Sequence, residues 1–145
     1  MWDYVIQFSN LMAPYPNLRT LQPNMQYFVR NGVTAQFQQG NISKGGEFCE
    51  LRPYLVARLL WNPDVDIRAE LADFLSGYYE EAGPHMAAYI DLMHDELEKS
   101  GLPLTIYGKP YDHYEKGYMR PELFARYEVL FDEAEKAVVS KPDVL

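Results

Sequence analysis

The feature that most constrains this fold is an alternating segment, residues 33–39, which runs directly into a glycine-rich turn around Gly45. Apolar and polar side chains alternate strictly along the segment, which predicts a β-strand with one apolar face. An amphipathic stretch of helical period, residues 47–61, follows the turn. A strand, a turn and a helix in this order are typical of a β/α unit in a parallel sheet, where ligands bind just beyond the carboxyl end of the strand.

A second alternating segment, residues 2–9, predicts another strand with aromatic residues on one side. Between the two strands, Pro23 favours the first turn of a helix that ends before Gly32. A strand, a helix and a strand in this order form a right-handed crossover, which places the two strands parallel in one sheet. Residues 1–42 are therefore expected to be α/β.

The remainder of the chain has the apolar period of helices. Asp66 is placed to cap one helix, Pro84 to open a second and Pro121 to begin a last one. Short connections between them predict antiparallel neighbours. The sequence therefore predicts a mainly α fold with a small parallel β element, in which residues 43–145 form a helical extension packed on residues 1–42.

Composition narrows the class of protein. Of the 145 residues, 48% are hydrophobic and 23% are charged, which is typical of a globular domain that can bury a core. The formal net charge of -8 argues against a nucleic-acid partner, because such proteins present a basic face. No apolar run is long enough to cross a membrane. The first residues lack the pattern of a signal peptide and resemble the middle of a protein.

Five residues near the expected strand ends form a candidate carbohydrate-binding site: Trp2, Asp3, Tyr4, Gln38 and Asn41. Sugars are bound by such sets, because aromatic rings cover the apolar face of the sugar while carboxylates and amides pair with its hydroxyls. The alternative is that Trp2 and Tyr4 belong to the core and that the amides satisfy nearby backbone groups. Sugar binding predicts that Trp2, Asp3, Tyr4 and Gln38 converge in one cleft. If these four side chains scatter or are buried in the core, that interpretation fails.

No catalytic residue is assigned, although the chain has 21 acidic residues. Glycoside hydrolysis normally needs two carboxylates across the scissile bond. Asp3 is the one acid on an expected strand, while Glu47 and Glu50 are better explained by the dipole of the helix that they begin. The remaining acids of interest resemble solvated helix faces: Glu70, Asp73, Glu80, Glu81, Asp91, Asp95, Glu96 and Glu98.

No metal or cofactor is expected either. His94 and Glu98 share a helix face, but one such pair supplies too few ligands, and pairing at the surface explains it better. Cys49, the single cysteine, has no neighbouring histidine and is expected to be a small buried residue. Residues 107–118 carry four tyrosines in a loop after a possible short strand at residues 104–107, and such rings usually pack over helix ends.

Several motifs of the chain are distinctive: Trp2-Asp3-Tyr4, Leu21-Gln22-Pro23-Asn24 and residues 32–40, 45–55 and 59–64. Together they resemble a domain family of unknown function in large bacterial proteins. That family is similar to glycoside hydrolases of the α-glucuronidase and hexosaminidase type and is frequent in gut polysaccharide degraders. The resemblance covers residues 2–95 and is less distinctive beyond them.

The resemblance implies the carboxyl-terminal part of a (β/α)8-like barrel with a helical extension. Trp2, Asp3 and Tyr4 would lie at the end of the seventh strand and Gln38 at the end of the eighth. Many relatives are expected to carry glutamate at the position of Gln38. An amide cannot act as a general acid or base, so the principal acids of such a barrel are expected on earlier strands.

The leading functional hypothesis is a fragment of a glycoside-hydrolase-like carbohydrate-processing protein, which contributes carbohydrate contacts and support but does not catalyse alone. The runner-up is a non-catalytic helical module for protein interaction, which forms a homo-oligomer through an apolar face left by missing strands. A free-standing enzyme would need a cleft with two acids at hydrolase spacing. An extracytoplasmic location is expected if the parent protein degrades polysaccharides.

Overall fold

The computed structural model describes residues 1–40, 45–141, 143 and 144. The fold is mainly helical with a small two-stranded parallel sheet, as the sequence predicts. The division expected between an α/β part, residues 1–42, and a helical extension, residues 43–145, stays a prediction. The chain divides into two compact units: the first comprises Met1–Ile67 and Pro103–Pro110, and the second comprises Arg68–Leu102 and Tyr111–Leu145.

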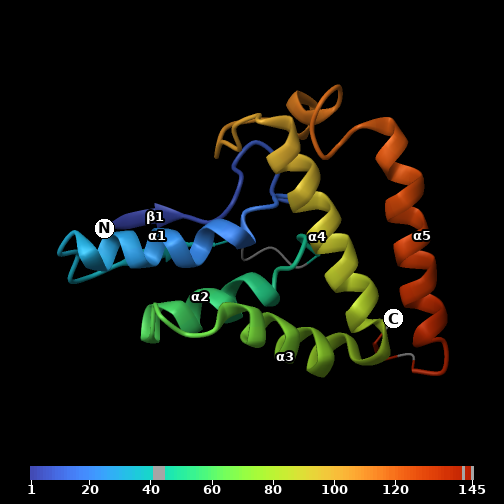
Figure 1. The fold of residues 1–145 in the computed structure, drawn as a ribbon, viewed down its shortest axis with the longest axis horizontal. Helices are drawn as coiled ribbons and strands as arrows, with labels where there is room; N and C mark the ends of the chain where they lie inside the picture. Colours follow the sequence, from blue (N-terminus) through green and yellow to red (C-terminus); the bar gives the residue numbers. More distant parts are fainter. Residues whose placement is uncertain (41–44, 142, 145) are drawn as a thin grey trace. The chain divides into compact units, whose positions relative to one another are not determined.

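The sheet of the first unit contains β1 (Trp2–Tyr4) and β2 (Phe37–Gln39), which pair in parallel. α1 (Leu18–Arg30) is the crossover between the strands and lies alongside β1 (Figure 1). α2 (Leu51–Trp61) follows β2 in the chain and contacts α1. The strand–helix–strand order predicted from the two alternating segments is therefore confirmed.

Both strands are shorter than the alternation predicts. β1 ends at Tyr4, and one further ladder bond joins the Val5 amide to the Gln39 carbonyl at 3.0 Å. Val5, Ile6 and Gln7 are all buried, so the chain is covered on both sides there and the alternation of exposure ends. The chain leaves the sheet at this point because its backbone finds another partner.

That partner is the return segment, Pro103–Pro110, which belongs to the first unit although it follows α4 in the chain. The Phe8 amide donates to the Ile106 carbonyl at 2.7 Å. The short strand expected at residues 104–107 is absent from the structure, but the segment supplies backbone acceptors. Two side chains also donate to it, Gln7 to the Gly108 carbonyl and Ser9 to the Tyr107 carbonyl.

α1 begins at Leu18, so the expectation that Pro23 occupies its first turn is wrong. Asn17 precedes the helix, and the Thr20 hydroxyl donates to the Asn17 carbonyl at 2.8 Å. Pro23 lies inside the helix, where its missing N–H removes one helical hydrogen bond. Its exposed position lets the ring face solvent. The helix therefore brings residues 18–22 into regular structure.

α1 and α2 supply most of the core of the first unit. Leu21 and Met25 of α1 are 3% and 2% exposed. Pro53 lies in the first turn of α2, where its missing N–H costs no helical bond. Three leucines of α2 recur at the spacing of one helix face and are nearly fully buried: Leu51, Leu55 and Leu59.

The second unit is built from helices. Its α4 and α5 contact each other and run antiparallel, as the short connections predict (Figure 1). The single turn η1 joins α3 to α4 without a loop. The elements in order are α3 (Ile67–Tyr79), η1 (Glu80–Ala82), α4 (Gly83–Ser100), η2 (Pro110–His113) and α5 (Pro121–Ala137).

Aromatic rings join α4 to α5. The ring of Tyr89 on α4 lies 5.3 Å from that of Tyr127 in an edge-on arrangement. The Tyr127 hydroxyl donates to the Tyr118 carbonyl at 2.7 Å, so the tyrosine-rich loop is attached to α5. Tyr118 is buried, but Tyr111 and Tyr114 of the same loop stack on each other with their rings exposed. Burial of one ring and exposure of two others show that the tyrosines of this loop do not all pack in the same way.

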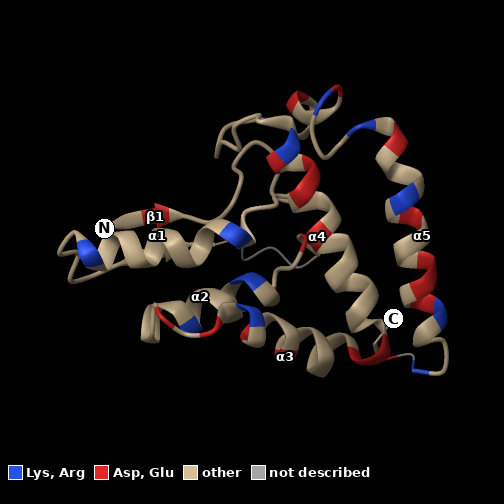
Figure 2. Cartoon of the chain, in the orientation of Figure 1, with Lys and Arg blue, Asp and Glu red and all other residues tan. Residues whose placement is uncertain are grey.

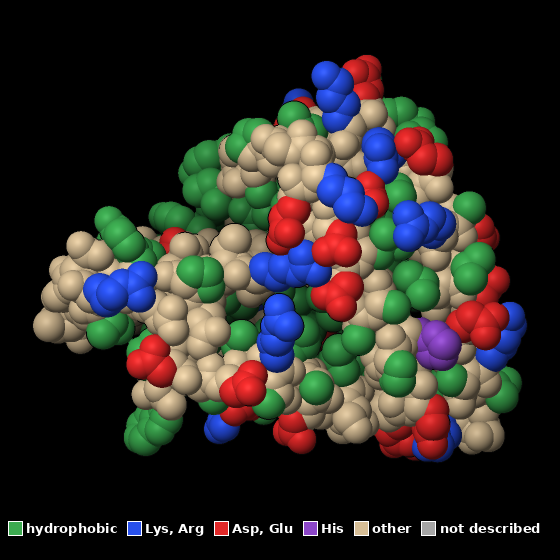
Figure 3. Space-filling model, in the orientation of Figure 1, with side chains coloured by type: hydrophobic (Ala, Val, Ile, Leu, Met, Phe, Trp, Pro, Cys, Tyr) green, Lys and Arg blue, Asp and Glu red, His purple; other side chains and the backbone are tan. Residues whose placement is uncertain are grey.

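Charged side chains of opposite sign lie beside one another on the second unit. Acidic and basic residues follow one another along α5 (Figure 2), and the face in Figure 3 shows them intermixed over α4 and α5. Lys141 forms ion pairs with Glu80 and Glu81, which attaches the chain after α5 to η1.

Across the described ranges, every helix is too short or too polar to cross a bilayer.

Two residues of α4 that were expected at the surface are buried. The Glu96 carboxylate accepts hydrogen bonds from Lys99 Nζ at 2.9 Å and from Arg120 at 2.5 Å. The bond from Lys99 is the main reason that the pKa of Glu96 is lowered. His94 is 2% exposed, and its Nδ1 lies 2.7 Å from the Ile90 carbonyl. The ion pair with Arg120 offsets the free-energy cost of burying the Glu96 carboxylate. Helical period alone does not reveal such a partner.

The buried His113 is expected to make the second unit less stable in acid. Its imidazole lies 4.7 Å from the Tyr118 ring, and burial lowers its pKa. The unfolded imidazole, with a pKa of about 6.5, therefore binds a proton before the folded one does. The stabilisation from neutral His113 is complete above about pH 6.5 and is lost as the pH falls towards the folded pKa.

Thermal unfolding followed by circular dichroism between about pH 7.5 and pH 5 measures this effect. The variant His113→Phe keeps an aromatic ring against Tyr118 but cannot bind a proton. Its stability should fall less steeply with acid than that of the parent chain. An equal slope in the two proteins would contradict the assignment to His113.

Candidate functional site

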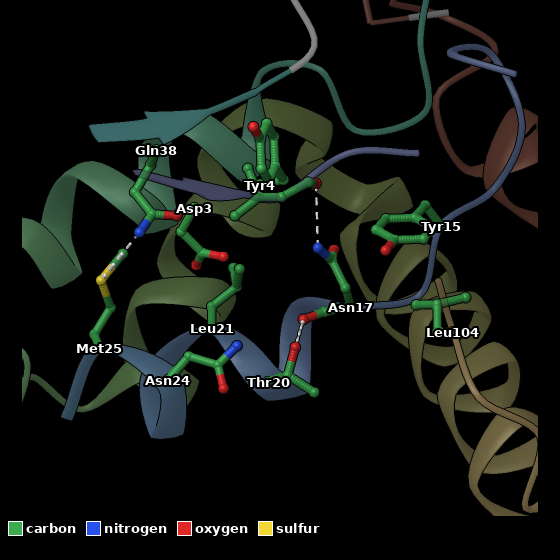
Figure 4. Close-up of a pocket in the computed structure, with 11 residues that line it drawn as sticks. Asp3, Tyr4, Tyr15, Asn17, Thr20, Leu21, Asn24, Met25, Gln38 and Leu104 are labelled. Atoms are coloured by element: carbon green, nitrogen blue, oxygen red, sulfur yellow. Dashed lines mark hydrogen bonds between the residues drawn. The ribbon is translucent and has the colours of Figure 1, made fainter. Parts of the chain in front are cut away.

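The strand period divides the candidate carbohydrate-binding residues between the two faces of the sheet. Trp2 and Tyr4 point to one face, and Asp3 points to the other because it lies between them. Gln38 is the register partner of Asp3 and shares its face, which is turned towards α1 (Figure 4). The four side chains therefore form two pairs, and the prediction that all four converge in one cleft is wrong. Asn41 lies outside the described residues.

Trp2 and Tyr4 of β1 share one face of the sheet with Phe37 and Gln39 of β2. This face is called the aromatic face. Trp2 is 61% exposed and Phe37 is 54% exposed, and their rings meet edge-on at 4.8 Å. The indole Nε1 of Trp2 donates to the Gln39 side-chain oxygen at 3.0 Å. Tyr4 and Gln39 are register partners at the carboxyl ends of the strands. The aromatic face is thus an exposed apolar surface with one amide at its edge.

The opposite face of the sheet borders a cavity of ≈ 280 Å³, called here the sheet pocket (Figure 4). Asp3 and Gln38 enter it from the strands, and the exposed Asn24 lines it from α1. Tyr15 closes one end, with its hydroxyl turned towards the cavity. Leu21 of α1 contributes an apolar wall. The pocket therefore combines acceptor groups from the sheet with an apolar surface from the helix.

Gln38 is incompletely bonded within this pocket. Its Nε2 donates to Gln36 Oε1 at 3.2 Å and approaches Met25 Sδ at 3.8 Å. Its Oε1 is buried and has no hydrogen-bond partner among the described residues. A buried acceptor without a donor costs free energy, so this oxygen favours a donor supplied by a bound molecule.

Asp3 is the one charged residue among those that line the sheet pocket. In the part of the chain that the structure describes, its carboxylate makes no side-chain hydrogen bond or ion pair. The pKa of Tyr15 is raised, first by burial and also by the Asp3 charge, while Arg52 opposes the rise. The Tyr15 hydroxyl consequently stays protonated and can donate a hydrogen bond at neutral pH.

Arg52 at the start of α2 supports the wall of the pocket from behind. Its guanidinium donates from Nε to Asn17 Oδ1 at 3.1 Å and from Nη2 to the Tyr15 carbonyl at 3.1 Å. Nη1 donates to the Glu47 carbonyl at 2.9 Å, and the Glu47 carboxylate lies 3.6 Å from Nη2. Asn17 donates in turn to the Val5 carbonyl at 3.1 Å. This Arg52 network connects β1, the start of α1 and the start of α2.

Glu47 and Glu50 are explained by local contacts. Glu47 Oε2 accepts a hydrogen bond from the Tyr15 amide at 3.0 Å, in addition to its contact with Arg52. Glu50 accepts from the Cys49 thiol at 2.9 Å, which is the main reason that the pKa of Cys49 is raised. Cys49 is half-buried, so the expectation of a buried cysteine is wrong. Among the described residues, no group of three potential metal ligands comes together.

Sequence reasoning missed the helical side of the pocket. Thr20, Leu21 and Asn24 line it from α1. Their spacing of three and four residues is that of one helix face, so a helix beginning before Pro23 would have placed them together. Arg52 was missed because a charged residue in an apolar helical stretch is usually exposed.

Comparison with known proteins identifies one matching family. A protein-family model described as a domain of unknown function (DUF4838) matches residues 1–91. That range includes β1, α1, β2, α2 and α3. Neither the curated proteins nor the solved structures include a significant match.

Proposed function

This chain belongs to the DUF4838 family, and we propose, from the resemblance of its motifs to glycoside-hydrolase-like proteins, that it contributes carbohydrate contacts and support to a protein of that kind. The contacts are assigned to the aromatic face, and the chain has no catalytic activity alone. The observation that carries the proposal is the exposed Trp2 ring of the aromatic face, whose nitrogen donates a hydrogen bond to the side-chain oxygen of Gln39 at the carboxyl end of β2. Stacking aromatic rings and orienting amides are the groups that proteins use to bind sugars.

The architecture supports a place at the end of a (β/α)8-like barrel. A parallel pair of short strands is marginal by itself and is normally part of a larger sheet covered on both faces. In a barrel, crossover helices cover the outside, so the face opposite α1 would point inward. Trp2 and Tyr4 would then lie inside the barrel, with Tyr4 and Gln39 towards the end where ligands bind.

Sugar binding is testable with the two tryptophans, since both are in the first unit. The parent chain should be retarded in native gels that contain soluble xylan or mixed-linkage glucan. Trp2→Ala should weaken this retardation by about tenfold, because a stacked ring contributes roughly a kcal/mol beyond its burial. The matched control is Trp61→Ala. Trp61 is 91% exposed, and it is the last residue of α2 rather than a residue of the sheet.

Two results would contradict the proposal. One is a parent chain that no polysaccharide retards, and the other is an equal effect of Trp61→Ala and Trp2→Ala. Release of nitrophenol from aryl-glycosides above a buffer blank would overturn the assignment of no catalysis.

The exposure of Trp2 and Phe37 also favours a second candidate, in which the aromatic face joins two copies of the chain. Sedimentation of the same proteins separates the two candidates. A concentration-dependent dimer that Trp2→Ala abolishes, without polysaccharide retardation of the parent, would favour an interaction module.

A further inference from the structure

The sheet pocket offers hydrogen-bond acceptors that the described residues leave without donors. The Gln38 Oε1 atom is buried and unpartnered. The Asp3 carboxylate faces the same space from the neighbouring strand (Figure 4). Two acceptors side by side repel each other unless a donor lies between them. A ligand that satisfies both must carry several N–H or O–H groups on one atom or on adjacent atoms.

The charge of the pocket selects among such ligands. Asp3 contributes one negative charge, and none of the residues that line the pocket is a lysine, arginine or histidine. A positively charged donor is therefore favoured over a neutral one, because a charge-assisted hydrogen bond is roughly twice as strong as a neutral one. Partial burial strengthens the attraction further, since the effective dielectric constant is lower than in water.

The shape of the sheet pocket narrows the class of ligand further. Leu21 and Met25 of α1 form an apolar wall beside the acceptors, and Leu104 of the return segment closes another side. The volume of ≈ 280 Å³ exceeds what a bare inorganic cation needs and accommodates a short alkyl chain. An ammonium head has three N–H donors, and the strands and α1 present three acceptor groups, in Asp3, Gln38 and Asn24.

We propose that the sheet pocket binds a primary alkylammonium group, with the ammonium between Asp3 and Gln38 and the alkyl stem along Leu21 and Met25. The group is either a small free amine or the side chain of a lysine from another protein, which share this chemistry. The site lies on the face of the sheet opposite the aromatic face. It therefore does not depend on the proposed carbohydrate contacts.

Chemical-shift titration of the ¹⁵N-labelled chain with n-butylammonium chloride tests the proposal, at constant ionic strength maintained with sodium chloride. The side-chain amides of Gln38 and Asn24 report on the pocket. Gln22 and Gln26, whose amides donate to Pro63 and the groups beside it, serve as reporters outside the pocket. Saturable shifts are expected for the first pair at millimolar concentrations, with the second pair unchanged.

Two comparison ligands separate charge from shape on the parent chain itself. n-Butanol has the same stem without the charge, and tetramethylammonium has the charge without N–H donors. Both should bind at least about tenfold more weakly than n-butylammonium, because each removes the charge-assisted hydrogen bonds. Equal binding of either ligand would overturn the proposal, whatever the behaviour of the variants.

The variant Asp3→Asn keeps the size of the side chain and removes its charge. It should weaken n-butylammonium binding at least about tenfold while leaving polysaccharide retardation unchanged. The matched control Glu115→Gln makes the same change in net charge at an exposed site in the second unit and should bind as the parent does. An unchanged affinity in Asp3→Asn would overturn the proposal.

A third ligand, Nα-acetyl-lysine methylamide, distinguishes the two sources. If it binds as n-butylammonium does, the pocket can take a lysine side chain. If n-butylammonium alone binds, the pocket takes small amines. Either result supports the proposal, and failure of both ligands to shift Gln38 and Asn24 would overturn it.

Discussion

Replacing Arg52 with methionine is expected to lower the free energy of unfolding of the first unit by about 3–5 kcal/mol. Arg52 is 4% exposed, and its guanidinium satisfies acceptors on Asn17, Tyr15 and Glu47 at once. Methionine fills a similar volume but donates no hydrogen bond. The variant would therefore remove the guanidinium donor from three oxygens, and the guanidinium charge from beside the Glu47 carboxylate, in a place where water has little access.

Urea unfolding followed by tryptophan fluorescence measures this effect, because Trp2 and Trp61 both belong to the first unit. Arg52→Lys keeps the charge but loses the planar fork, so it should recover part of the stability. Arg30→Met is the matched control, since Arg30 is exposed in the last turn of α1 and should change stability by about 0.5 kcal/mol or less. A loss in Arg52→Met no larger than that of the control would show that the network adds little.

Two glycines of the second unit are expected to respond to the same substitution with opposite signs. A Cβ atom at Gly83 would lie 2.8 Å from the Leu75 carbonyl oxygen, and backbone atoms cannot rotate away as a side chain can. Gly83→Ala should therefore destabilise the second unit by about 1–3 kcal/mol. A Cβ atom at Gly77 meets nothing within 4 Å, so Gly77→Ala should stabilise α3 by up to about 1 kcal/mol.

Each alanine variant is the control for the other, because both replace a glycine of right-handed helical conformation at or near the joint between α3 and α4. Thermal unfolding monitored at 222 nm gives the two shifts relative to the parent chain. Shifts of the same sign would mean that helix propensity, rather than the approach of Gly83 to Leu75, decides the outcome.

Periodicity in the sequence predicted the type and order of the main elements but misplaced their ends. The apolar spacing of Leu51, Leu55 and Leu59 identifies the buried face of α2 without further information. The start of α1 was misplaced because Pro23 is most common in a first turn, whereas here the helix tolerates it inside. β1 ends early because residues 7–9 find backbone partners far away in the sequence, which no local pattern reveals.

The candidate site could be predicted in its residues more readily than in its geometry. Adjacent residues of a strand point to opposite faces, so Trp2 and Asp3 could be separated from the sequence alone. Pairing Asp3 with Gln38 additionally required the register of the sheet. The contribution of Asn24 depended on where α1 begins. The burial of Glu96 depended on Arg120, which approaches it from a later segment of the chain.

The return segment also determines when the first unit can be completed during synthesis. Residues 7 and 9 bond to carbonyls that lie 101 and 98 positions later in the chain, beyond all of α3 and α4. A nascent chain that has emerged up to Ile67 carries both strands and two helices but lacks those acceptors. Long-range closure of this kind slows folding, because chain entropy is lost before the contacts form. On the ribosome, α3 and α4 therefore emerge before the segment after β1 finds its acceptors, so the first unit is completed only once the return segment has emerged.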